Sequence, residues 1–169
     1  VSCLSSAIRY GRKNMKKILI VYLFAIVYFA SFTTTQATIQ AHRIQLDGLR
    51  MDTTLEEIKD KYGRPDYVDS SAAGYTRWNW DSGLSILHRR YKFLTATATK
   101  PGLVTFDDVS VGDPAYRLTD VYGTADKVFT DSQYDSYYYY NEKGVGYLSF
   151  SVSKLAGDIV EIHMDRTSV

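Results

Sequence analysis

The chain has 169 residues, with 20 basic and 19 acidic side chains, and its only cysteine is Cys3. The sequence after Cys3 therefore provides neither a disulfide nor a zinc site built on cysteine. Five of the basic residues and none of the acidic ones precede Thr38, so residues 38–169 carry a net charge of −4. That balance argues against a nucleic-acid partner, which would favour a basic face.

The N-terminal segment carries the pattern of a secretory signal peptide. Residues 15–17 (MKK) precede an apolar run at residues 18–32, and Thr35-Gln36-Ala37 follows. A basic start, an apolar stretch of ~7–15 residues and a small-x-small site predict a signal peptide over residues 15–37, cleaved at its last alanine. Residues 1–14 are expected to be a non-native extension. The alternative is an uncleaved anchor, which would be the only contact with a membrane.

A signal peptide without a lipid-bearing cysteine at its cleavage site predicts a free exported protein. The predicted location is periplasmic or extracellular, and the sequence leaves the choice between them open.

The same phrase occurs twice in the chain. Residues 60–66 (DKYGRPD) and 120–126 (DVYGTAD) both read Asp-x-Tyr-Gly-x-x-Asp, sixty residues apart. A gapless offset of sixty residues also aligns apolar positions on both sides of the phrase. An internal repeat is typical of units that cannot bury their apolar face alone. We predict two repeat units, at residues 38–101 and 102–169, with chance similarity as the alternative.

Each unit is expected to begin with a helix that ends at the repeated glycine. In the first, Thr53 or Thr54 with Glu56 or Glu57 forms a capping box, and Gly63 supplies a left-handed stop. The expected apolar stripes are Leu55, Ile58 and Tyr62 in the first helix and Ala115, Leu118 and Tyr122 in the second.

The second helix has a different start signal. Asp113 is expected to cap it and Pro114 to occupy its first position, where the missing N–H costs nothing. Gly123 is expected to end it, as Gly63 ends the first.

Short strands separated by Gly, Asp and Asn turns follow each helix. The expected strands lie at residues 75–80, 84–93 and 94–99 in the first unit and at 136–140, 145–152 and 159–164 in the second. The predicted fold class is α+β, with two tandem helix-plus-antiparallel-meander repeats sharing a layered helix/sheet core.

These residues also carry a family resemblance. LRMDTTLEEIKDKYGRPD followed by WNW resembles the unit of the outer-membrane assembly lipoproteins of the BamE (SmpA/OmlA) type. Two such units in an exported chain resemble the β-lactamase inhibitory proteins. The chain lacks the lipid-bearing cysteine of the first family and the disulfides expected of the second. The resemblance implies a tandem helix-and-sheet protein that binds another protein.

Motifs for catalysis are absent from the sequence. His42, His88 and His163 share no local spacing, and the chain has no GxSxG, HExxH, glycine-rich phosphate loop or CxxC. We predict no catalytic residues, no metal and no cofactor. The Asp107-Asp108 pair is expected in a solvated turn. A cell-wall glycan hydrolase with paired carboxylates remains the alternative, because carboxylate separation is a three-dimensional property.

Four consecutive tyrosines at residues 137–140 suggest a binding face. Alternate residues of a strand face opposite sides, and the sixty-residue offset aligns Tyr138 and Tyr140 with Trp78 and Trp80, which are expected to face the core. The opposite face then holds the predicted binding residues Tyr137, Tyr139, Tyr134, Tyr147, Arg77 and Asn79. The alternative is that these tyrosines simply favour strands and pair across them.

Exposed tyrosines on a rigid sheet supply contact area at low entropic cost. We therefore predict an exported, non-enzymatic protein-binding module, either an envelope-assembly accessory or an inhibitor. Its partner would be another exported or envelope protein. A structural spacer is the third alternative.

Overall fold

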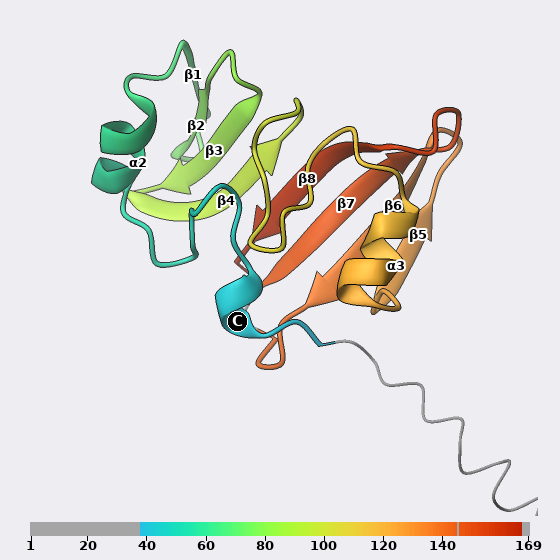
Figure 1. Cartoon of the computed structure of the whole chain (residues 1–169). Helices are drawn as coiled ribbons and strands as arrows, with labels where there is room; N and C mark the ends of the chain where they lie inside the picture. The colour runs from blue at the N-terminus through green and yellow to red at the C-terminus, as the bar shows by residue number, and fades with distance from the viewer. Residues whose placement is uncertain (1–37, 145, 167–169) are drawn as a thin grey trace, which may run out of the picture. The chain divides into compact units, whose positions relative to one another are not determined.

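The computed structural model describes residues 38–144 and 146–166, and the predicted extension (1–14) and signal peptide (15–37) lie outside them. Figure 1 shows the arrangement of the elements. The helices are η1 (Ala41–Arg43), α2 (Leu55–Tyr62) and α3 (Tyr116–Tyr122). The strands are β1 (Tyr67–Ser70), β2 (Tyr75–Asn79), β3 (Leu84–Arg89), β4 (Lys92–Ala98), β5 (Lys127–Thr130), β6 (Tyr134–Tyr140), β7 (Tyr147–Ser153) and β8 (Ile159–Asp165). No helix within the described ranges is long and apolar enough to cross a membrane.

The eight strands form one antiparallel sheet in the order β1-β2-β3-β4-β8-β7-β6-β5. At its centre β4 pairs with β8, with Thr97 opposite His163. The prediction of two tandem helix-plus-antiparallel-meander repeats is therefore wrong: the described chain is a single sheet with two short helices. The physical reason is that β4 and β8 would each be an unpaired edge alone, and pairing them satisfies their backbone groups. The predicted boundary between residues 101 and 102 stays a prediction.

The start of α2 follows the sequence prediction. Thr54 Oγ1 accepts a hydrogen bond from the Glu57 N–H (3.2 Å), and Glu57 Oε2 accepts one from the Thr54 N–H (2.7 Å). This reciprocal capping box satisfies donors that the first turn leaves free. Leu55 and Ile58 then face the core.

Both helices end at the predicted glycines, but not in the predicted conformation. Gly63 has φ 74° and ψ −161°, and Gly123 has φ 76° and ψ −152°. This is not the left-handed helical region but a region that essentially only glycine occupies. The N–H of each glycine still bonds back into the helix, to Lys59 O and Thr119 O respectively.

The predicted start of α3 is wrong. The helix begins at Tyr116, with Ala115 at the capping position and no side-chain cap. Asp113 instead accepts a hydrogen bond from the Ser110 N–H through Oδ2 (2.9 Å), and its carbonyl accepts one from the Ile159 N–H (2.8 Å). Asp113 is thus committed to a turn and to the start of β8, so it is not free to cap the helix.

The strand predictions missed both edges of the sheet and one turn. β1 and β5 have four residues each, too short for a clear alternating pattern. The expected strand at residues 84–93 is divided by a turn at Arg90 and Tyr91, which have φ of 48° and 65°. Two successive positive φ values are typical of the tight hairpin turn that links β3 to β4.

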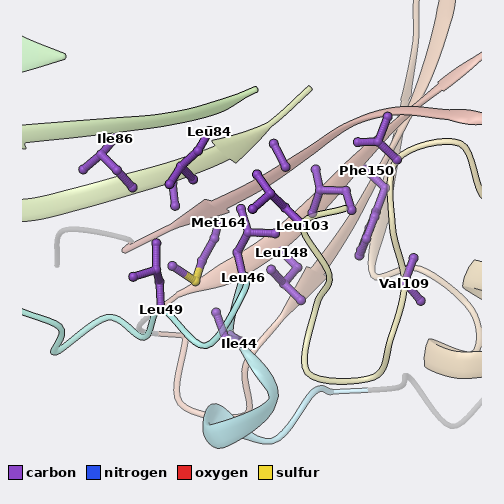
Figure 2. Packing of buried hydrophobic residues seen from close by; sticks show 14 of the residues in the cluster. Ile44, Leu46, Leu49, Leu84, Ile86, Leu103, Val109, Leu148, Phe150 and Met164 are labelled. Carbon is purple, nitrogen blue, oxygen red and sulfur yellow. The ribbon is translucent and has the colours of Figure 1, made fainter. Parts of the chain in front are cut away.

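One continuous core lies on the helix-bearing face of the sheet. Buried apolar side chains from the helices, the connecting loops and the strands form a single cluster. Figure 2 shows Leu46 and Leu103, from the loops that precede α2 and α3, beside Leu148 and Met164 of the sheet. All four are less than one-tenth exposed. Burial of this cluster is the main favourable term for a fold without disulfides.

Replacing Gly63 by alanine should lower the free energy of unfolding by about 1–3 kcal/mol, because alanine disfavours this backbone region. A Cβ at Gly63 would meet no atom within 4 Å, so the loss would come from the backbone alone. Urea denaturation measures the change. Asp60→Ala, on the exposed last turn of α2, is the control and should shift stability by no more than about 0.5 kcal/mol. Equal stability of Gly63→Ala and the parent would contradict the prediction.

Candidate binding face

Strand register divides the side chains of the sheet between two faces. One row runs from Trp78 through Ile86, Ala96 and Met164 to Tyr139, and its members are buried under the helices and loops. The neighbouring row on the opposite side contains Asn79, Ser85, Thr97, His163, Ser149 and Tyr138. No described helix covers this second side, which we call the open face.

Aromatic rings gather on the open face at β5, β6 and β7. Tyr138 and Tyr140 each lie 5.5 Å from Tyr147, centroid to centroid, and Phe129 lies 5.3 Å from Tyr138. Tyr147 is also 6.1 Å from the ring of His163. These spacings fall in the range of favourable aromatic pairs. We call Phe129, Tyr138, Tyr140, Tyr147 and His163 the open-face cluster.

A series of polar side-chain contacts fixes the orientation of His163 and Tyr147 in the open-face cluster. His163 Nδ1 lies 2.9 Å from Thr97 Oγ1, and its Nε2 lies 3.6 Å from Asp165 Oδ2. The Tyr147 hydroxyl donates to the same Asp165 oxygen at 3.3 Å. Burial and the Asp165 carboxylate raise the pKa of Tyr147. Tyr147 therefore stays protonated at neutral pH and presents an apolar ring with its hydroxyl engaged.

The structure separates the six predicted binding residues. Tyr134, Tyr147, Arg77 and Asn79 lie on the open face, as the register shows. Tyr137 and Tyr139 lie on the opposite side, so their predicted orientation is wrong. Tyr139 is 1% exposed and packs 5.2 Å from the ring of Tyr122, and Tyr137 is partly buried against the core. Burial raises the pKa of Tyr139 to about 12.

A difference of one residue in a loop explains this error. Residues 71–74 connect β1 to β2, whereas only residues 131–133 connect β5 to β6. The Asp66 N–H bonds to Asn79 O, and the Asp126 N–H makes the same contact with Tyr138 O. The corresponding partners are thus 59 residues apart, not sixty. A slip of one residue moves every side chain of a strand to the other face.

The residues that sequence reasoning missed are Tyr138, Tyr140, Phe129 and His163. The orientation of Tyr138 and Tyr140 could have been predicted from β7. Its sequence YLSFSVS alternates buried Leu148, Phe150 and Val152 with polar serines. That alternation fixes the faces of β7, and pairing then fixes those of β6. Within β6 four identical residues conceal the alternation.

A hollow lies on the helix-bearing side of the sheet, between α2 and the turn that follows β3. It has a volume of about 620 Å³ and is lined by residues that include Lys59, Trp78, His88 and Tyr91. The His88 ring lies 4.5 Å from the Trp78 ring, and neither His88 nitrogen has a hydrogen-bond partner among the described residues. Burial and the nearby Lys59 charge lower the pKa of His88. Both effects favour the neutral imidazole.

Several acidic side chains serve as structural partners. Asp107 forms an ion pair with Arg43 at 3.0 Å, which joins the segment before α2 to the loop before α3. Asp108 lies in a turn with φ 61°. Within residues 38–144 and 146–166 there is no group of three or more His, Cys, Asp or Glu side chains that could hold a metal ion.

The fold and face define an antiparallel-sheet protein with one helix-covered side and one open aromatic side. No protein-family model and no curated protein matches the chain. Solved structures share the fold at low identity. A cysteine-rich secretory protein from Staphylococcus aureus has a TM-score of 0.57 at 11% identity, covering 78% of this chain and 48% of its own.

Two further structures are similar. An extracellular protein containing a SCP domain from Bacillus anthracis has a TM-score of 0.50 at 12% identity over 68% of this chain and 43% of its own. A DUF4309 family protein (YjgB) from Bacillus subtilis has a TM-score of 0.50 at 15% identity over 71% of this chain and 83% of its own. The chain thus spans less than half the length of the two secretory or extracellular neighbours.

These neighbours, together with the single sheet, overturn the predicted resemblance to tandem BamE-type and β-lactamase inhibitory proteins. That resemblance relied on one helix with its glycine stop and on the WNW that follows it, and a helix that stops at a glycine recurs in unrelated folds.

Tyr139→Ala should lower the free energy of unfolding by about 3–5 kcal/mol, because it empties a fully buried aromatic site. Tyr138→Ala, one residue away on the open face, should cost no more than about 1.5 kcal/mol through lost ring contacts. Chemical denaturation of both variants measures the contrast. The opposite order of stability would mean that β6 has the other register.

Protein stability should depend on pH through His88. Its folded pKa lies below the unfolded value of ~6.5, so its contribution is complete above that pH and declines as pH falls toward the folded pKa. His88→Leu should therefore show a smaller loss of unfolding free energy than the parent between about pH 7 and pH 5. Parallel stability–pH curves for parent and variant would exclude this role.

Proposed function

We propose that this chain is an exported, non-enzymatic binding module that takes a protein partner on its open face. The signal pattern at residues 15–37 supports export. Two structural neighbours are described as secretory or extracellular, in keeping with that location. The periplasm and the cell exterior both fit.

The open-face cluster is the observation that carries the proposal. Its rings come from adjacent strands held in register, so they form a rigid surface with little rotamer entropy to lose on binding. Phe129 is 49% and Tyr134 38% exposed, and both belong to this side. A contiguous aromatic surface is the composition that protein interfaces favour at their centre. A structural spacer would have no need of it.

The corrected face contains different tyrosines from those first predicted. In this proposal Tyr138 and Tyr140 take the place of Tyr137 and Tyr139, and Tyr134, Tyr147, Arg77 and Asn79 stay in the proposed binding set. In the register Arg77 belongs to the row of Tyr140 and Tyr147, and Asn79 to the row of Tyr138. Arg77 and Asn79 lie on β2, with β3 and β4 between them and His163 of the cluster, so the open face has polar side chains toward one end and aromatic rings toward the other.

Capture from envelope and culture extracts should depend on Tyr138 and Tyr140. Changing both to serine is expected to reduce retention of the partner at least about tenfold, because central aromatic anchors dominate binding energy. The matched control changes Tyr91 and Tyr116 to serine. These tyrosines are 90% and 67% exposed and lie outside the cluster.

Two outcomes would contradict the proposal. Equal retention by both double variants would remove the open face from binding. Retention that survives protease treatment of the extract would mean that the captured molecule is not a protein, and would favour glycan binding.

A further inference from the structure

The two edges of the sheet are open to solvent along their whole length. All four residues of β1 and all four of β5 are exposed. Apolar side chains stand out among them: Tyr67 is 64% exposed, and Val68, Val128 and Phe129 are each 49% exposed. An unprotected edge with apolar side chains is a template for pairing with another strand.

The hydrogen-bonding pattern shows which backbone groups of each edge point outward. The Ser71 N–H bonds to Tyr75 O, and the Asp131 N–H bonds to Tyr134 O. Because bonding alternates along an antiparallel strand, the odd-numbered residues of β1 and of β5 point their backbone groups inward. The N–H and C=O of Val68 and of Val128 therefore point away from the sheet.

The two edges are complementary to each other. In an antiparallel alignment with Val68 opposite Val128, Tyr67 lies opposite Phe129, and Asp69 lies opposite Lys127. Tyr67, Asp69, Lys127 and Phe129 all belong to the open face, since they pair with Asn79, Arg77, Tyr138 and Ser136 respectively. These positions would be non-hydrogen-bonded pairs, in which side chains approach most closely.

We propose that β1 of one molecule pairs with β5 of a second copy of this chain, joining the two sheets edge to edge. The Val68–Val128 pair exchanges backbone hydrogen bonds, and the Asp69–Lys127 ion pair selects the register. Pairing of like edges lacks this match. With Val68 opposite Val68, Asp69 faces Tyr67, and with Val128 opposite Val128, Lys127 faces Phe129.

This contact is head-to-tail, so a joined pair of molecules still has one free β5 edge and one free β1 edge, at opposite ends. Such an interface can repeat from molecule to molecule, as an open chain or a closed ring. In this register three residues of each strand face each other, so each junction buries far less than the ~800 Å² per partner of a stable complex. Association is therefore weak and depends on concentration. It is independent of the partner proposed for the open face.

Sedimentation velocity of the purified protein over a concentration series tests the proposal. The weight-average sedimentation coefficient of the parent should rise with concentration and fall in high salt, because salt screens the exposed ion pair. Asp69→Lys and Lys127→Asp should each weaken association about tenfold or more, because each places like charges opposite one another. Both residues are exposed, so Lys127→Asp should leave the unfolding midpoint close to that of the parent. Asp69→Lys should lower it slightly, because Asp69 lies opposite Arg77 in its own sheet.

Charge exchange gives the decisive result. The double variant Asp69→Lys/Lys127→Asp should associate as the parent does, and so should a 1:1 mixture of the two single variants. A parent that stays monomeric at every concentration would overturn the proposal. Association that neither single reversal weakens would overturn it as well, as would loss of association in the Tyr138→Ser/Tyr140→Ser variant but not in the charge variants.

Discussion

Strand register is the constraint on which the rest of this structure depends. Side chains alternate between the two faces of the sheet, and helices cover only one face, so pairing decides which residues enter the core. The buried row from Trp78 to Tyr139 crosses six strands without a break in alternation. The same register places Tyr138 and Tyr140 on the other, open side, where both are half-buried. The core and the open aromatic face are therefore two consequences of one set of backbone hydrogen bonds.

Local interactions were predictable from the sequence and non-local ones were not. The capping box of Thr54 and Glu57 lies within four residues, and Gly63 ends its helix through the backbone alone, so both follow from residue type. The fold class failed because the pairing of β4 with β8 joins residues more than sixty positions apart. The predicted cap at Asp113 failed because its side chain accepts a hydrogen bond from the Ser110 N–H instead, while its carbonyl bonds to Ile159, forty-six positions away.

The orientation of the tyrosines shows how a small local difference decides a site. The loop before β6 is one residue shorter than the loop before β2, and this reverses which members of residues 137–140 are buried. Composition alone predicted that some of these tyrosines would form a face. Only the alternation in β7, read together with its pairing to β6, identifies which ones. A fold shared at 11–15% identity adds no information on this point, because function resides in the side chains placed on the fold.

Asp69 and Lys127 connect the edges of the sheet with its open face. A charged residue on an edge strand ordinarily protects it from pairing. Here the two edges carry opposite charges at positions that meet in one antiparallel register, so the charges favour pairing of β1 with β5 over pairing of like edges. Lys127 also lies 4.2 Å from the Phe129 ring, and Phe129 contacts Tyr138 of the open-face cluster. A second copy docked on β5 would therefore place its Tyr67 beside this cluster, so that joining molecules would extend the aromatic surface rather than cover it.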